Sequence, residues 1–245
     1  MSMEPIKSKE PLRISAKQLG QVELTDFCER CFWVKMRCGG KPPFQTPVPG
    51  IFSSLDAMTK RVTRSHFEKH GHVPRWLDGF GELGEPVPIP HHTRFCVVDP
   101  PTAIKLTGVP DEIFKQADGT LFIADNKTAK WNDNQQRILP MYRIQLNAYG
   151  YIAERIGMGT VRGLGLVYHQ PQTEVDVSNI DSIAMADGFS IRFSAKLVPV
   201  RLDMESIPRL LQRVRSLADL PVVPDGRANC KDCALLNKLV EVIAQ

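Results

Sequence analysis

The order of apolar and polar positions predicts helices at both ends of the chain and strands between them. Apolar residues recur with helical spacing over residues 25–37, 53–70, 140–155, 205–217 and 233–243. Short apolar runs predict strands over residues 94–98, 104–114, 121–124, 161–169 and 188–201. Stretches rich in Pro and Gly at 41–49 and 73–90 predict loops. This order predicts an α/β fold class, with a mixed sheet flanked by helices.

Local signals sharpen some of these boundaries. Gly39 and Gly71 follow two of the predicted helices, where glycine commonly ends a helix. Pro140 suits the first turn of the helix over 140–155. Ala117-Asp118-Gly119 is a turn signal between two strands. The run Leu121-Phe122-Ile123-Ala124 is typical of a strand buried on both faces.

Composition and charge narrow the class of protein only slightly. The chain has 245 residues, of which 42% are hydrophobic and 24% charged, as in ordinary globular proteins. A net charge of +4 and a pI of about 8.7 permit a nucleic-acid partner but do not demonstrate one. The first twelve residues lack an apolar run, so we expect a loose tail and no signal peptide. No apolar stretch approaches the roughly 18 residues of a membrane span, so we predict a cytoplasmic protein without a membrane partner.

Two carboxylates and a lysine form the strongest chemical pattern. Asp125 and Lys127 follow the apolar run and are two residues apart, so on a strand they share a face. Asp111 precedes the predicted turn, and a hairpin would return it to the side of Asp125. Such carboxylates are ligands for a hard divalent cation, to which the peptide carbonyl of Asn126 adds another oxygen. A bound cation activates water for phosphodiester hydrolysis, and Lys127 would orient that water or stabilise the phosphate.

By itself the Asp-x-Lys pattern also fits an ordinary ion pair on a surface hairpin. The motifs that precede and follow it favour a catalytic role. Gly108 begins a Gly-x-Pro-Asp segment that ends at Asp111, and the predicted helix over 140–155 carries Gln145-x-x-x-Tyr149, whose ends share one helix face. In this order the chain resembles the RecB-type branch of the PD-(D/E)XK nuclease superfamily.

The resemblance implies a restriction-endonuclease-like core, Mg²⁺ or Mn²⁺ as cofactor, and DNA as substrate. It also implies that Gln145 and Tyr149 line the active site. In this family an early helix supplies another metal ligand, and we favour His66 in the helix over 53–70. His70, Glu68 and Asp56 are alternatives, as is a zinc site made by His66 and His70.

Cysteine pairs near the two ends predict a second metal site. Cys28 and Cys31 form one Cys-x-x-Cys motif, and Cys230 and Cys233 form the other. Four thiolates suit tetrahedral zinc or an iron–sulfur cluster, and either would join the two ends of the chain. The pairs also add a resemblance to CRISPR-adaptation exonucleases, in which one early and three late cysteines hold such a cluster. The resemblance favours an iron–sulfur (4Fe-4S) staple here, while the two-plus-two arrangement leaves Zn²⁺ open. Unrelated free thiols or a redox dithiol are the other interpretations.

Together these patterns predict a nuclease in three segments. Residues 1–50 would form a tail and a cysteine-bearing helix, residues 51–170 the nuclease core, and residues 171–245 accessory elements. We expect DNA cleavage at ends, flaps or single strands, in repair, recombination or CRISPR adaptation alongside partner proteins of those pathways. Lys130 and Trp131 are candidate DNA contacts, through charge and base stacking. The alternatives are a non-catalytic, metal-stapled DNA-binding module of the same fold and a redox protein.

Overall fold

The computed structural model describes residues 11–40, 49–174, 176, 178 and 180–245. Most of the predicted N-terminal tail (residues 1–10) and of the predicted proline-rich loop (residues 41–48) lies outside the described residues. None of the described helices combines the length and the apolar composition that a bilayer crossing requires.

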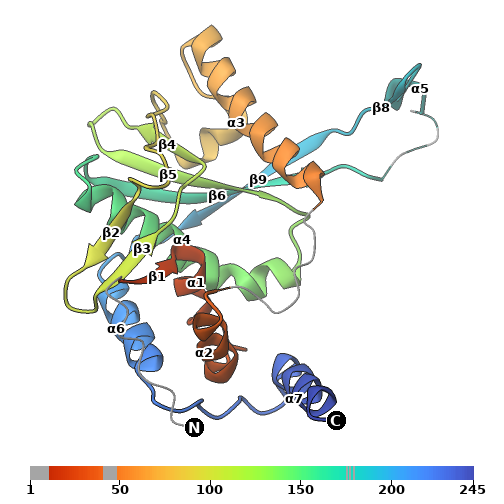
Figure 1. Ribbon diagram of the computed structural model, residues 1–245. Helices are drawn as coiled ribbons and strands as arrows, with labels where there is room; N and C mark the ends of the chain where they lie inside the picture. The colour runs from red at the N-terminus through yellow and green to blue at the C-terminus, as the bar shows by residue number, and fades with distance from the viewer. Residues whose placement is uncertain (1–10, 41–48, 175, 177, 179) are drawn as a thin grey trace.

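Two sheets and a small hairpin contain the described strands (Figure 1). The first sheet has the order β1-β3-β2, from strands Leu12–Ser15, Ile104–Thr107 and Cys96–Asp99. The second has the order β4-β5-β6-β9, from strands Glu112–Lys115, Leu121–Thr128, Val161–Pro171 and Phe193–Val200. The hairpin pairs β7 (Ala184–Met185) with β8 (Gly188–Phe189). Because β5 pairs in parallel with β6 while β4 and β9 pair antiparallel, the larger sheet is mixed, as predicted.

Helices cover both faces of the larger sheet (Figure 1). Helix α4 joins β5 to β6 and packs on one face, whereas α3 crosses the other face over β5. The described helices are α1 (Ala16–Gln21), α2 (Glu29–Arg37), α3 (Gly50–His70), α4 (Asp133–Arg155), α5 (Ile180–Ile183), α6 (Ser206–Ala218), α7 (Lys231–Ile243) and the 3₁₀ helix η1 (Arg75–Phe80). Sheets flanked by helices confirm the predicted α/β class.

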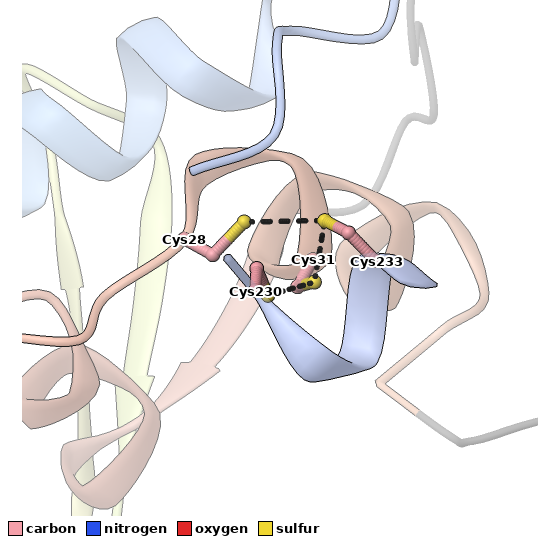
Figure 2. A group of neighbouring side chains, drawn as sticks. All are labelled: Cys28, Cys31, Cys230 and Cys233. Carbon is pink, nitrogen blue, oxygen red and sulfur yellow. Dashed lines mark hydrogen bonds between the residues drawn. The ribbon is translucent and has the colours of Figure 1, made fainter. Parts of the chain in front are cut away.

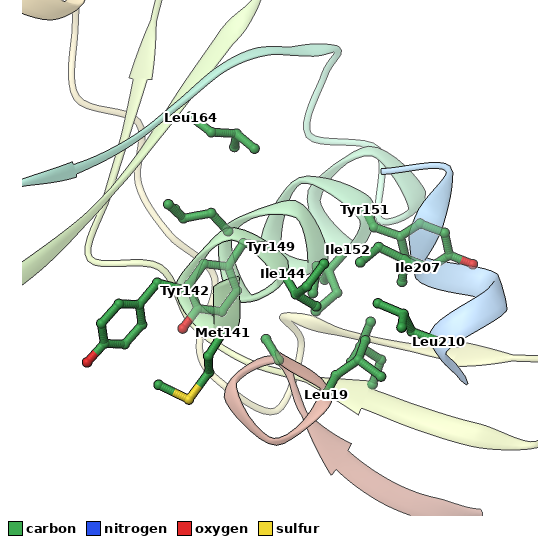
Figure 3. Close-up of a cluster of buried hydrophobic side chains, with 14 of the residues drawn as sticks. Leu19, Met141, Tyr142, Ile144, Tyr149, Tyr151, Ile152, Leu164, Ile207 and Leu210 are labelled. Atoms are coloured by element: carbon green, nitrogen blue, oxygen red, sulfur yellow. The ribbon is translucent and has the colours of Figure 1, made fainter. Parts of the chain in front are cut away.

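Strand β5 contributes to a core on each of its faces. Leu121 and Ile123 join the larger hydrophobic cluster, in which α1 and α6 pack against α4 (Figure 3). Phe122 and Ala124 join a smaller cluster beneath α3 and η1. The alternation follows from the two-residue period of a strand. Because both faces of residues 121–124 are buried, all four residues are apolar, as expected for a strand buried on both faces.

The predicted strand over 104–114 is wrong as one element, because the chain changes sheets within it. Residues 104–107 form β3, and residues 112–115 form β4 of the other sheet. Pro110 lies in the connection and lacks the N–H that a continuous ladder needs.

The predicted first turn at Pro140 is also wrong, because α4 begins seven residues earlier at Asp133. Asn132 caps the helix by accepting a hydrogen bond from the N–H of Gln135 at 3.1 Å. Pro140 removes the N–H that would reach the carbonyl of Gln136, but Gln136 is exposed and water can replace the bond.

Strand β1 and helix α1 were not predicted. Leu12 and Ile14 alternate with polar residues, and β1 pairs in parallel with β3, 92 residues later at Leu12↔Ile104. Ser15 and Gln18 form a capping box at the start of α1. That Ser-x-x-Gln signal is visible in the sequence. The predicted strand over 188–201 starts only at Phe193, because Gly188 pairs within the small hairpin.

Candidate active site and cysteine cluster

The structure brings Asp111, Asp125 and Lys127 together where β5 leaves the core. Asp125 is only 3% exposed, and the Lys127 ammonium contacts its Oδ2 atom. Asp111 lies just before β4, and its Oδ2 accepts a hydrogen bond from the backbone N–H of Asn126 at 2.8 Å. The hairpin of β4 and β5 thus returns Asp111 to the side of Asp125, as the sequence predicted.

Burial makes the negative charge of Asp125 unfavourable. Desolvation, opposed by Lys127 and assisted by repulsion from Asp111, raises the pKa of Asp125 to about 6. The buried Oδ2 atom of Asp125 forms an ion pair with the Lys127 ammonium. A divalent cation would further offset the negative charge of this buried carboxylate, and carboxylate oxygens are ligands that such cations prefer.

Glu112 is a second buried carboxylate, and the sequence analysis missed it. It is paired with Ala124 in the β4–β5 register, and its Oε1 atom has no hydrogen-bond partner among the described residues. Desolvation, followed by repulsion from Asp111, raises its pKa to about 7. Its position next to Asp111 in the sequence is the only signal that would have found it.

Helix α3 adds a lysine that no sequence pattern indicated. Lys60 Nζ lies 2.7 Å from Asp111 Oδ1 and 2.8 Å from Asp56 Oδ2. Desolvation would lower the pKa of Lys60, but hydrogen bonds to the two aspartates raise it. The candidate site therefore lies between α3 and the end of β5, with lysines contacting both aspartates.

Helix α4 contributes the predicted Gln145 and Tyr149, both buried. Gln145 Nε2 donates to the Tyr149 hydroxyl at 2.6 Å, and burial raises the pKa of Tyr149. The Oε1 atom of Gln145 has no hydrogen-bond partner among the described residues. Tyr142, one turn earlier, places its ring 4.3 Å from Lys127 Nζ. The predicted helix face thus lies beside the carboxylates.

The Gly-x-Pro-Asp segment begins with glycine at Gly108, where neighbouring side chains leave no room for a Cβ atom. A Cβ atom there would lie 2.5 Å from Cε1 of Tyr149 and 3.2 Å from Cβ of Ala16. Any side chain at this position would push the Tyr149 ring out of place.

Asn126 points toward the other face of the sheet. Its Oδ1 atom lies 3.0 Å from Nε2 of His169 on β6, and its Nδ2 atom is buried without a hydrogen-bond partner among the described residues. Desolvation lowers the pKa of His169, which favours the neutral imidazole. The sequence patterns did not indicate His169. Its contact with Asn126 links this face of the sheet to the candidate active site.

The predicted metal ligand His66 lies away from the carboxylates. Its Nδ1 atom is 3.0 Å from the carbonyl oxygen of His72, and its ring lies 4.5 Å from that of His70. Within the described chain, no hydrogen bond or ion pair joins His66 to Asp111 or Asp125. The α3 residue that contacts Asp111 is Lys60, nearly two turns earlier, and Lys60 also pairs with Asp56.

The two predicted DNA contacts differ in exposure. Lys130 is exposed, and its Nζ atom lies 3.5 Å from Glu174 Oε1. Trp131 is half-buried and packs edge-on against Tyr168, with ring centroids 4.8 Å apart. Lys196 lies over the Trp131 ring at 5.4 Å, which leaves a positive charge beside it.

The four predicted cysteines converge where α2 meets α7 (Figure 2). Their sulfur atoms all lie within 4.8 Å of one another, and the shortest separation is 3.4 Å, between Cys31 and Cys233. Each motif begins at the residue preceding a helix, so all four sulfurs lie at the positive ends of α2 and α7. The cluster joins the two ends of the described chain.

Backbone N–H groups at the start of α2 and at Arg227 favour the thiolate form of Cys28. Burial alone would raise the pKa of Cys28, but hydrogen bonds from the backbone N–H groups of Cys31 and Arg227 lower it to about 6. The N–H of Arg227 lies 3.3 Å from Cys28 Sγ. Burial and the other thiols raise the pKa of Cys31. Four adjacent sulfurs therefore need a cation before all of them ionise, which fits a bound metal.

The chain was compared with models of protein families, with curated proteins and with solved structures. The sequence model of the PD-(D/E)XK nuclease superfamily matches residues 45–237. No curated protein matches the chain. The solved structure titled "Crystal structure of SSO0001" is similar at 16% identity and a TM-score of 0.38, covering 86% of this chain and 78% of that one.

Proposed function

Because the chain belongs to the PD-(D/E)XK nuclease superfamily, we propose that it is a divalent-metal-dependent nuclease that hydrolyses DNA phosphodiester bonds. The observation that carries this proposal is the grouping at the end of β5, where Lys127 contacts Asp125 and Asp111 accepts a hydrogen bond from the intervening Asn126. The Gly108, Gln145 and Tyr149 positions support assignment to the RecB-type branch within that superfamily.

Asp111, Asp125 and the backbone carbonyl of Asn126 would hold Mg²⁺ or Mn²⁺. When bound, the ion supplies an activated water and stabilises charge on the phosphate. Glu112 shares the sheet face of its register partner Ala124, beneath α3, whereas Asp125 faces α4, so Glu112 is a buried neighbour of Asp111 and not a ligand shared with Asp125. His66, the ligand predicted from the early helix, lies beside His70 and His72.

The chain's own side chains would then orient the reaction. Lys127 contacts Asp125 and is placed to direct a water or a phosphate oxygen. The ring of Tyr142 lies beside its ammonium and restricts where the lysine points. Lys60, which contacts Asp111, would contribute positive charge to a substrate phosphate bound beside that carboxylate. Gln145 and Tyr149 fix the helix face against which these groups pack.

The proposed substrate class rests on membership of the nuclease superfamily. We propose DNA with ends, flaps or single-stranded regions, and roles in repair, recombination or CRISPR adaptation. Lys130 and the pair of Lys196 and Trp131 are candidate contacts to the strand.

The spacing of the cysteine sulfurs favours zinc over the iron–sulfur cluster. Four sulfurs each about 2.3 Å from a tetrahedral ion lie about 3.8 Å apart. In a 4Fe-4S cluster each thiolate binds a different iron, and the sulfurs lie about 6 Å apart. Three of the sulfur pairs are 3.4, 3.5 and 3.6 Å apart and all four sulfurs lie within 4.8 Å of one another, which supports a single ion. We therefore propose a structural Zn²⁺ bound by Cys28, Cys31, Cys230 and Cys233.

Cleavage of labelled single-stranded and flapped DNA tests the function. Wild type with Mg²⁺ or Mn²⁺ is expected to cleave, and Asp125→Ala to lose activity by about 100-fold or more, because it removes a direct ligand. Asp118→Asn, in the exposed turn of the same hairpin, is the matched control and should cleave like wild type. Binding of DNA by wild type without cleavage in either metal would instead identify a non-catalytic DNA-binding module.

A further inference from the structure

An apolar pocket lies between α3 and the end of the larger sheet. It has a volume of about 190 Å³. Its walls include Met58, Val62, Trp76, Thr128, His169 and Phe193. Met58 is 61% exposed and Trp76 is 40% exposed, although both are large and apolar. Large apolar side chains grouped at a surface in this way mark a binding site.

The pocket adjoins the Asp111 side of the candidate active site. On β5, Thr128 lines the pocket on the same sheet face as Asn126, whose backbone N–H donates to Asp111. On α3, Thr59 lines the pocket and directly precedes Lys60, which contacts Asp111. A ligand whose phosphate lies at the carboxylates would therefore reach the pocket with its neighbouring groups.

A chain of hydrogen bonds links the two sites as well. His169 Nε2 lies 3.0 Å from Asn126 Oδ1. The backbone N–H of the same Asn126 donates to Asp111 at 2.8 Å. The imidazole that borders the pocket is thus fixed by the residue between Asp125 and Lys127.

We propose that this pocket binds one unstacked nucleobase of the strand whose phosphate lies at Asp111 and Asp125. The proposal rests on the proposed nuclease function and names a subsite for its substrate. A cavity of about 150 Å³ takes up a benzene ring, so this volume admits a single base but not a base pair. The indole of Trp76 and the ring of Phe193 offer aromatic surfaces, and Thr128 and His169 offer polar groups for the edge of a base.

The chemistry of the surroundings selects a base over an apolar peptide side chain. Lys60 follows the pocket residue Thr59 and contacts Asp111, so the ligand must carry negative charge on the Asp111 side and a flat apolar group on the other. A single-stranded nucleotide has both features. Stacked duplex DNA keeps its bases covered, so the pocket favours single strands, flaps and frayed ends.

Fluorescence anisotropy with two labelled probes tests the subsite. One probe is a short single-stranded thymidylate, and the other is the same backbone built with abasic residues. Without added Mg²⁺ or Mn²⁺, wild type is expected to bind the thymidylate about tenfold or more tightly than the abasic strand, as stacking on aromatic residues predicts. Trp76→Ala and His169→Ala are expected to lose this preference and to bind the abasic strand as wild type does. Trp76→Phe is expected to retain most of it.

Phe189→Ala, an exposed aromatic on the distant β7–β8 hairpin, is the matched control and should keep the preference (Figure 1). Equal binding of both probes by wild type, or a preference that survives both alanine variants, would overturn the base subsite. Cleavage in Mg²⁺ is scored separately. A base preference without cleavage would refute the nuclease and keep the subsite, whereas cleavage without a base preference would refute only the subsite.

Discussion

Buried carboxyl groups distinguish the candidate active site at the scale of single residues. Asp125 and Glu112 are almost inaccessible to solvent, and desolvation raises the pKa of each, to about 6 and about 7. Such groups cost stability when they ionise without a partner. A site that binds a cation gains from this arrangement, because the bound ion offsets the repulsion. The same residues should therefore make the metal-free protein sensitive to pH.

Replacing Glu112 tests this expectation. Its folded pKa of about 7 lies above the ordinary value of 4.5, so the folded state holds a proton that the unfolded state has lost between these pH values. The free energy of unfolding should therefore fall as pH rises from about 4.5 to 7 and then stay low. Glu112→Gln removes this loss, so urea unfolding of the metal-free variant should show a gain over wild type on the order of 3 kcal/mol at pH 8.

That gain should largely disappear near pH 5, where wild-type Glu112 is protonated. Glu85→Gln, an exposed glutamate on the segment beside β4, is the matched control and should show no such pH-dependent difference. A stability difference between Glu112→Gln and wild type that is the same at both pH values would show that the fold does not raise the pKa of Glu112, contrary to this account.

At the scale of elements, the active-site helix depends on close packing between α4 and the chain around Gly108. The Tyr149 ring is held on one side by its hydrogen bond to Gln145 and on the other by the backbone at Gly108. The ring therefore has little room to retreat from an added methyl group.

Gly108→Ala should lower stability by roughly 1–3 kcal/mol, because its Cβ would overlap Cε1 of Tyr149. Cleavage should fall with it, since the displaced ring lies beside Asp125 and Asp111. Thermal unfolding together with the DNA cleavage assay measures both effects. Gly50→Ala, at the first residue of α3 with open space around it, is the control and should be neutral or slightly stabilising. Unchanged stability and activity in Gly108→Ala would remove the packing explanation for this glycine.

At the scale of the whole molecule, the cysteine cluster brings together α2 and α7, which are distant in the sequence, and the proposed Zn²⁺ would join them. Around the sulfurs, Arg30 donates to Asn237 on α7 at 2.8 Å. Arg37 donates to the carbonyls of Ala218 and Leu220 after α6, at 3.2 and 3.1 Å. Much of α7 remains exposed, so the cluster supplies a large part of what anchors this helix.

Cys233→Ser should therefore release α7 and lower the Tm by about 5–10 °C, since loss of a structural metal removes several kcal/mol. Metal analysis of wild type should give about one Zn²⁺ per chain, in a colourless protein, and the variant should lose it. Cys38→Ser changes an exposed cysteine outside the cluster and should leave the zinc content and Tm unchanged. A brown wild-type protein with iron and sulfide would instead establish the iron–sulfur cluster.

The sequence determined the features that depend on short-range geometry. The strand period puts Asp125 and Lys127 on one face after a fully apolar run, and the turn at Asp118 returns the chain toward Asp111. The helix period puts Gln145 and Tyr149 on one face. The Cys-x-x-Cys spacing fixes each half of the metal site, since both members lie in one helix start.

Only the tertiary structure decided which distant segments meet. Lys60 reaches Asp111 because α3 crosses β5, and Trp76 approaches His169 because η1 packs beneath the same sheet. The pairing of β1 with β3 has the same origin. Local propensities fix the spacing of neighbours along one element. The position of one element on another depends on burying apolar surface between residues far apart in the chain, which no short segment specifies.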